Sequence, residues 1–269
     1  MAEFRTPFFR SYLCNQPELV DLVLKERPDD FPKSDRVREG LTPLLGNSVF
    51  VTNGEEWKRQ RRIIDPAFEG GRLRDVFPAM RAAGVGAVAR MARLADGTPR
   101  EIEAETSHVA ADVIFRTLFS IPIENEIAGR VFEEFREHQR TQPVVNIAAL
   151  IPFPRWLPRP HRTRTKQTAA VIRGLITQLT SQRMAEIKVG TAPDDLATKI
   201  MTTPDPVDGK VFETEEMVDQ VAIFFLAGHE TSASALAWAL YLLALYPEWQ
   251  DRVAAEALAF GPEGPEFKD

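Results

Sequence analysis

Residues 227–231, which read AGHET, place polar groups in the middle of the longest predicted helix of the chain, which is otherwise apolar on nearly every side. Burying an acid such as Glu230 is costly unless the group is paired or used. Gly228 weakens helix propensity by about 1 kcal/mol relative to alanine. The hydroxyl of Thr231 can donate to the carbonyl of Ala227, four residues earlier, which loosens a helix. The pattern therefore predicts a local widening in a buried helix that can admit a flat ligand and water.

A second pair of side chains suits carboxylate binding. Trp57 and Arg61 are four residues apart, so they share one face of the helix predicted there. An indole N–H and a planar guanidinium aimed at one point form a clamp for a carboxylate. The alternative reading of this pair is a solvated basic helix, residues 58–62, with a packed tryptophan.

Both segments resemble signatures of one family. Residues 227–231 look like the central-helix signature of the cytochrome P-450 haem-thiolate monooxygenases. Residues 54–68, GEEWKRQRRIIDPAF, resemble the haem-propionate helix of the same family, including its terminal P-x-F. The two segments stand in the family's order, about 170 residues apart, and the predicted helices match the family from about residue 8 to the end.

The resemblance implies a function and roles for particular residues. The protein would bind haem b, activate dioxygen and hydroxylate a small apolar molecule, with electrons from a ferredoxin or flavoprotein. A hydroxyl and an acid beside bound dioxygen can relay protons to it through water. The implied roles are cofactor binding for Trp57, Arg61, Ala227 and Gly228, and proton delivery for the catalytic pair Thr231 and Glu230.

Two elements of the family are missing downstream of the central helix. One is an E-x-x-R helix, and the other is the loop whose cysteine ligates the iron. Cys14 is the only cysteine, and its surroundings, SYLCNQPE, lack the features of that loop, so no residue of this chain is predicted to ligate the metal. We therefore expect a partial reading frame or truncated product that has no monooxygenase activity alone, and whose exposed apolar helix faces favour aggregation.

The periodicity predicts a mainly α protein, a P-450-like helical core that is incomplete, with minor β structure near the N-terminus. Residues 1–269 are expected to form a single incomplete domain. Thr214, Thr52 and Ser107 are expected to cap helices. The predicted helices cover residues 17–27, 36–46, 53–64, 72–94, 107–119, 124–140, 163–187, a short segment from 194, the central helix 214–246 and a last helix from 247; residues 8–14 and 47–52 are predicted to be β-like, 141–161 a proline-rich connector and 204–209 a turn.

Composition narrows the function classes. The chain has 269 residues, 44% of them hydrophobic and 27% charged, with a net charge of −6, so it reads as a soluble globular protein without the charge of a nucleic-acid binder. No signal peptide opens it, and no apolar run reaches about 18 residues, so we predict no membrane anchor and a cytoplasmic location.

Other functions are weaker alternatives. The first is a non-catalytic helical binding or scaffold module, which predicts no haem uptake even when the missing part is supplied. A zinc site of the H-E-x-x-H type fails because Ala233 stands where the second histidine would be; the four histidines are read as surface or packed residues. The basic residues of 155–166 are read as a solvated loop, and the basic helix 58–62 is a weak candidate for docking an acidic electron donor.

Overall fold

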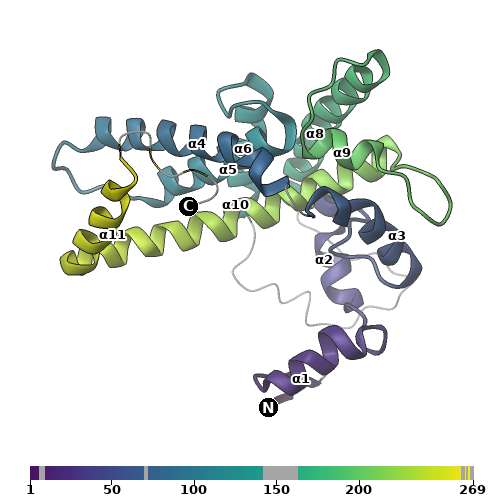
Figure 1. The fold of residues 1–269 in the computed structure, drawn as a ribbon. Coiled ribbons are helices and arrows are strands. Elements are labelled where there is room, and N and C mark those ends of the chain that lie inside the picture. The colour runs from purple at the N-terminus through teal and green to yellow at the C-terminus, as the bar shows by residue number, and fades with distance from the viewer. Residues whose placement is uncertain (6–9, 70–71, 142–162, 262–263, 265, 267–269) are drawn as a thin grey trace. The chain divides into compact units, whose positions relative to one another are not determined.

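The computed structural model describes residues 1–5, 10–69, 72–141, 163–261, 264 and 266, and these are mostly helical (Figure 1). The strands in this part are β1 (Ala2–Arg5) and β2 (Arg10–Leu13), which pair antiparallel. The α-helices are α1 (Pro17–Asp21), α2 (Asp35–Leu45), α3 (Gly54–Ile64), α4 (Arg72–Leu94), α5 (Glu103–Phe119), α6 (Glu126–Thr141), α8 (Thr163–Val189), α9 (Leu196–Thr202), α10 (Thr214–Leu245) and α11 (Pro247–Ala259); η1 (Leu22–Glu26) is a π-helix, and η2 (Pro28–Asp30) and η3 (Asp65–Ala67) are 3-10 helices. The predicted fold class, mainly α with minor β near the N-terminus, is confirmed.

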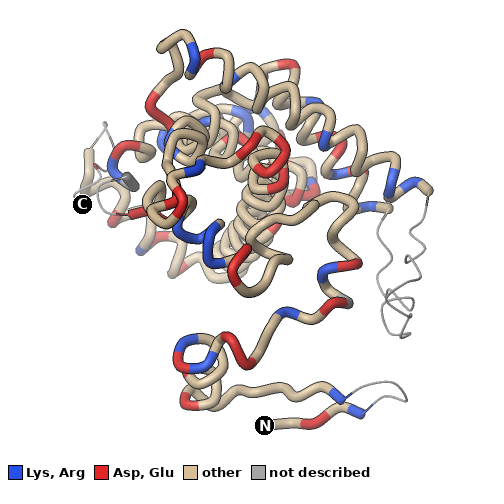
Figure 2. The backbone as a smooth tube through the Cα atoms, turned by 90° about the vertical axis from the view of Figure 1, so that its right-hand side faces the viewer, with Lys and Arg blue, Asp and Glu red and all other residues tan. Residues whose placement is uncertain are grey.

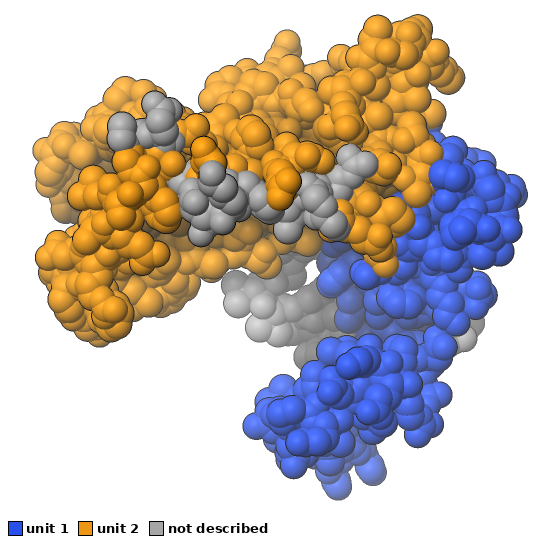
Figure 3. Space-filling view, in the orientation of Figure 1, with its two compact units in different colours: residues 1–63, 133–180, 204–223 blue, residues 64–132, 181–203, 224–269 orange. Residues whose placement is uncertain are grey.

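The chain divides into two compact units, coloured separately in Figure 3. Unit 1 comprises residues 1–63, 133–180 and 204–223, and unit 2 comprises 64–132, 181–203 and 224–269. Helices α6, α8 and α10 contribute residues to both units, and the last residue of α3, Ile64, belongs to unit 2.

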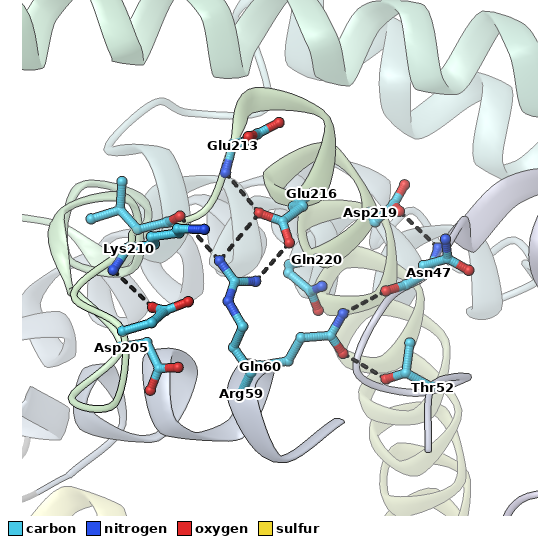
Figure 4. A network of polar contacts seen from close by, with 12 residues as sticks. Asn47, Thr52, Arg59, Gln60, Asp205, Lys210, Glu213, Glu216, Asp219 and Gln220 are labelled. Carbon is cyan, nitrogen blue, oxygen red and sulfur yellow. Dashed lines mark hydrogen bonds and ion pairs between the residues drawn. The ribbon is translucent and has the colours of Figure 1, made fainter. Parts of the chain in front are cut away.

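In unit 1, a buried polar network joins the turn before α3 to the first turns of α10 (Figure 4). The carboxylate of Asp219 accepts a hydrogen bond from the Asn47 backbone N–H at 2.7 Å, and the side chain of Gln220 accepts one from the Val49 N–H at 2.9 Å. Gln60 on α3 donates to the Asn47 carbonyl at 2.6 Å and accepts from Thr52 at 2.6 Å. Because buried backbone groups must find partners, these side chains fix the course of residues 47–52.

The same unit holds an arginine–carboxylate pair between α3 and the turn at 204–209. Arg62 donates from Nε to Oδ1 of Asp205 at 2.7 Å and from Nη2 to Oδ2 at 2.9 Å. Asp205 is buried, with 2% of its surface exposed. The Arg62 guanidinium lowers the pKa of this carboxyl below its ordinary 3.8, and the Val207 N–H adds to the effect.

This pair predicts a specific acid sensitivity. A carboxyl whose pKa is lowered by folding stabilises the folded state above its ordinary pKa, and the contribution is lost as the pH falls through the lowered value. In Asp205→Asn that contribution is absent, so its melting temperature should lie below that of the wild type at pH 6 and approach it below pH 3.8. Asp208→Asn, in the same turn but exposed, is the control. An Asp205→Asn deficit that is equal at pH 6 and at about pH 2.5 would show that the ion pair does not stabilise the fold.

Unit 2 is built around the packing of α4 against α5. Ala83 and Ala87 of α4 are buried with Val109 of α5, and Val113 packs against them. Small residues at these positions allow the two helices to approach closely. Helix α9 begins at an N-cap, because the carboxylate of Asp195 accepts from the Thr198 N–H at 3.0 Å.

Several predicted elements need correction. Residues 47–52 form turns and not a strand, because their backbone groups bond to side chains of α3 and α10 instead of a partner strand. Thr52 is not the cap of α3, because the helix begins at Gly54 and Asn53 directly precedes it; the Thr52 hydroxyl donates to Oε1 of Gln60 at 2.6 Å. Thr214 is the first helical residue of α10 and therefore not its N-cap. The residue before the helix is Glu213, whose backbone N–H donates to the Glu216 carboxylate at 2.9 Å.

The start of α5 was also predicted wrongly. The helix begins four residues earlier than Ser107, which lies inside it and donates to Glu103 at 2.8 Å. Helices α4, α10 and α11 begin or end within a residue of their predicted limits. The predicted proline-rich connector at 141–161 falls almost entirely outside the described residues.

The second half of α10 is exposed, so it is not the buried helix that its apolar sequence predicted, but this agrees with the expectation that the incomplete chain has exposed apolar helix faces. Trp238, Tyr241 and Leu245 are 60%, 51% and 53% exposed, and Trp249 of α11 is 52% exposed. Within the described ranges, no helix is both long and apolar enough to cross a membrane.

Candidate cofactor and catalytic site

The predicted catalytic residues lie in the part of α10 that belongs to unit 2. Thr231 donates from Oγ1 to the carbonyl of Ala227 at 2.6 Å, which confirms the predicted bond back along the helix. The helix remains α-helical through this segment, so the predicted widening is not seen. Ala227, Glu230 and Thr231 are exposed, and only His229 of the segment is buried. The expectation of buried polar groups in this segment is therefore wrong for Glu230 and Thr231, because the helix face that carries them is uncovered.

Ala227 and Gly228 line a cavity of about 540 Å³ within unit 2. Its walls come from η3, α4, α5, α9 and α10, and only Thr117 and Ser232 contribute polar side chains. The Thr117 hydroxyl is already bonded to the carbonyl of Val113 at 2.8 Å. The cavity is lined by Ala67, Phe68, Val76, Met80, Val109, Ala110, Val113, Ile114, Thr117, Leu118, Leu196, Phe224, Ala227, Gly228, Ser232 and Leu236. Such a surface suits an apolar group of the size that ligand pockets usually hold.

Gly228 has a packing role that the sequence did not predict. A Cβ added there would lie 3.0 Å from Cδ1 and 3.3 Å from Cγ1 of Ile114 on α5. The missing side chain therefore lets α5 approach α10 at the edge of the cavity. Close packing of the two helices accounts for this glycine without any ligand.

His229 is packed among aromatic rings on the buried side of α10. Its ring stacks on Phe225 with centroids 5.4 Å apart and meets the edge of Phe132 at 5.6 Å. This confirms the interpretation of His229 as a packed histidine. Among the described residues no group of His, Cys, Asp or Glu is arranged to hold a metal ion.

Trp57 and Arg61 lie together on α3 in unit 1. The Arg61 guanidinium carbon is 5.9 Å from the centre of the Trp57 ring. Trp57 is half-buried and Arg61 is exposed. The ammonium of Lys33 lies 5.3 Å from the same ring, so a third residue joins the pair. The contact of Lys33 with Trp57 was not predicted. Lys33 lies 24 residues before Trp57 in an irregular segment, so no helical or strand periodicity places the two side chains together.

The other basic residues of α3 are engaged within unit 1. Arg59 pairs with Glu216 at 2.6 Å, Arg62 pairs with Asp205, and Lys58 lies 3.3 Å from Glu55. Figure 2 shows that acidic and basic residues are interspersed along the chain. The two arginines face internal acids, which weakens the case for this helix as a docking surface for an acidic electron donor.

The residues of this chain suit two parts of haem, the cofactor that the resemblance implies: its apolar face and its carboxylates. Ala227 and Gly228 line a cavity that is almost free of polar groups. Trp57, Arg61 and Lys33 offer an N–H and two positive charges of the kind that bind carboxylates. The iron ligand does not fit: Cys14 is the only thiol of the sequence, and it directly follows strand β2 in unit 1, half-buried.

Comparison with known proteins identifies relatives along nearly the whole chain. A model of the family described as "Cytochrome P450" matches residues 10–269. "Cyclooctat-9-en-7-ol 5-monooxygenase" of Streptomyces melanosporofaciens is 32% identical over 269 residues, covering 95% of this chain and 54% of that protein. "Cytochrome P450 CYP72A616" of Paris polyphylla is 29% identical over 262 residues, and "7-deoxyloganic acid hydroxylase" of Catharanthus roseus is 27% identical over 265 residues; each alignment covers 93% of this chain and 50% of the relative. The chain thus spans about half the length of these relatives.

Solved structures share the fold. The heme domain of cytochrome P450DA superposes with a TM-score of 0.69 at 21% identity, covering 92% of this chain and 53% of that one. A Cytochrome P450 described as CYP102L1 gives a TM-score of 0.72 at 24% identity, with 97% and 59% covered.

Proposed function

Because this chain belongs to the cytochrome P450 family, we propose that its parent protein is a haem b-dependent monooxygenase that hydroxylates a small apolar molecule. The observation that carries the proposal is the AGHET segment of α10, whose first two residues line an apolar cavity of about 540 Å³. Two of the relatives are named as a hydroxylase and a monooxygenase. Haem, when bound, supplies the binding and reduction of dioxygen; a ferredoxin or flavoprotein would supply the electrons.

The residues of this chain would hold the cofactor and move protons. Trp57 and Arg61 would bind the carboxylates of haem, and Ala227 and Gly228 would lie against its flat face. The Thr231 hydroxyl donates its hydrogen bond to the Ala227 carbonyl, so its oxygen would accept a hydrogen bond from a water molecule. The neighbouring Glu230 carboxylate is exposed and would exchange protons between that water and the solvent.

We propose further that the 269-residue chain is inactive alone. Its only thiol, Cys14, stands in a sequence context unlike a haem-ligand loop, and the chain covers about half of its relatives. A thiolate ligand tunes the iron for splitting dioxygen, so the rest of the parent protein would have to supply it.

The test is haem binding by this chain with and without the missing part of the parent. Each form would be mixed with hemin, reduced and exposed to carbon monoxide. We expect a thiolate-type carbonyl spectrum only from the longer form. In that longer form, the Thr231→Ala variant should yield about 10- to 100-fold less product per dioxygen consumed. The control is Thr231→Ser, which keeps the hydroxyl. A thiolate-type spectrum from the 269 residues alone would contradict the inactivity proposal. No haem uptake by the longer form would favour a helical scaffold module.

A further inference from the structure

Arg90 ties the end of α4 to the first turn of α5 within unit 2. Its Nε donates to Oε2 of Glu105 at 3.3 Å, and the two side chains are 18% and 24% exposed. A charge-assisted N–H···O bond is usually about 2.7–2.9 Å long, and arginine often pairs with a carboxylate through two such bonds. In the part of the chain that the structure describes, Nη2 of Arg90 is buried and has no hydrogen-bond partner. The pair is therefore made through one long bond and leaves a buried donor unused.

His108 stands beside this pair with an unused hydrogen-bonding group of its own. It lies three residues after Glu105 on α5, so the two side chains share one face of the helix. Its Nδ1 is buried and finds no partner within the described ranges, and its ring meets the uncharged ring of Phe132 on α6 with centroids 5.7 Å apart. Burial, and after it the positive charge of Arg90, lower the pKa of His108 below its ordinary 6.5. The histidine is thus held neutral at pH 7 next to a carboxylate.

Three carboxylates act on His108, and two of them are paired with another cation. Asp112 of α5, Glu124 of the turn before α6 and Glu105 all favour the charged form of the imidazole. Asp112 accepts from Arg116 at 2.8 Å, and Glu124 lies 3.7 Å from the same arginine. Glu105 is held by the single long bond from α4. It is therefore the carboxylate that a protonated His108 can draw away at the lowest cost.

We propose that Arg90, Glu105 and His108 form a proton-operated link between α4 and α5, in which Glu105 exchanges Arg90 for His108 when the imidazole takes up a proton. A protonated imidazole carries an N–H on both nitrogens, so Nδ1 can donate to Glu105 whichever tautomer is present at neutral pH. The new positive charge also repels Arg90. Because Arg90 is the α4 side of the link, the end of α4 should then loosen from α5. The link is part of the fold, and the inference does not depend on haem or on the proposed function.

The pH range of the link follows from the histidine. A base whose pKa is lowered by folding stabilises the folded state above its ordinary pKa, here 6.5. That contribution is lost as the pH falls through the lowered value. The link should therefore be closed at about pH 7.5 and should open progressively below pH 6.5.

The test is hydrogen exchange of this chain at about pH 7.5 and about pH 5, followed by mass spectrometry and corrected for the pH dependence of amide exchange itself. In the wild type, the amides of residues 86–94 should be about fivefold less protected at the lower pH, the size expected for one hydrogen bond. Residues 74–80, at the other end of α4, should show no such change. His108→Gln has no group to protonate there, so its protection should be equal at the two pH values. Arg93→Gln, at an exposed arginine near the end of α4, should behave like the wild type.

NMR titration of the imidazoles tests the coupling directly. Arg90→Gln should raise the pKa of His108, because it removes the neighbouring charge and leaves Glu105 available, whereas Glu105→Gln should lower it. In the wild type, which needs no variant to fold, the loss of α4 protection should follow the titration of His108, assigned through its backbone resonances. The inference is wrong if the wild type keeps its protection at both pH values, or if His108→Gln still loses it. An unchanged pKa of His108 in both Arg90→Gln and Glu105→Gln would equally overturn it, since the three side chains would not be coupled.

Discussion

Gly46→Ala is expected to destabilise the protein by about 3 kcal/mol, which is large for the addition of one methyl group. Gly46 ends α2 with φ +51° and ψ −131°, a backbone conformation that is accessible mainly to glycine. A Cβ there would stand 2.1 Å from Oδ1 and 2.3 Å from Cγ of Asp219. The Asp219 carboxylate would have to move, although it pairs with Arg173 at 2.7 Å and accepts from the Asn47 N–H.

The matched control lies in the same helix. Gly40 is inside α2, and an added Cβ would meet nothing within 4 Å. Gly40→Ala should therefore stabilise the protein by about 0.5–1 kcal/mol through helix propensity alone. Urea denaturation followed by circular dichroism would measure both variants. Equal effects of the two substitutions would mean that neither the backbone conformation nor the Asp219 contact constrains Gly46.

The Gly46 turn matters to the candidate site because it starts the segment that leads into α3. The Asn47 and Val49 N–H groups that bond to Asp219 and Gln220 follow the turn directly. The Val49 carbonyl then accepts from Lys33. A displaced turn should therefore weaken the setting of Trp57 and Lys33 as well as the fold.

The sequence was sufficient to predict the long helices, because their signals are local. Helix α4 has the predicted limits, and α10 was expected from an apolar stretch between an acidic first turn and Pro247. The AGHET pattern and the Trp57–Arg61 pair were also predicted from residues that are neighbours within one helix. The bond from Thr231 to Ala227 spans only four residues, which explains why it could be predicted.

The errors arose where a distant partner decides the structure. Residues 47–52 have a β-like composition, but the side chain of Gln220, 171 positions from Val49, accepts the hydrogen bond of the Val49 N–H. Thr52 was expected to cap α3, but the helix begins at Gly54, and the Thr52 side chain is bonded to buried Gln60 at 2.6 Å. Lys33 reaches Trp57 through turns that no periodicity describes. Local propensity is a weak guide when tertiary contacts compete for the same groups.

The second large effect is expected at Arg183, in the part of α8 that belongs to unit 2. Its side chain is only 5% exposed and forms an ion pair with Asp195, whose side chain is also 5% exposed. Arg183 further donates to the Phe119 carbonyl at 2.7 Å and to Thr198 Oγ1 at 2.9 Å. Asp195 accepts in addition from Ser120 at 2.8 Å. A buried pair whose hydrogen bonds are satisfied on both sides becomes strongly destabilising when one partner is removed.

Arg183→Met should therefore reduce the free energy of unfolding by about 3–5 kcal/mol, because it leaves the Asp195 carboxylate buried without its counter-charge. The double variant Arg183→Met/Asp195→Asn removes both charges and keeps a side chain that can cap α9, so it should be less destabilised than Arg183→Met alone. Arg100→Met is the control, since Arg100 and Asp96 are 46% and 51% exposed and an exposed pair contributes little. Urea midpoints would rank the three proteins. A double variant that is less stable than Arg183→Met would mean that Asp195 stabilises α9 independently of the arginine. The effect of removing Arg183 would then come from its lost packing and not from a buried carboxylate without a counter-charge.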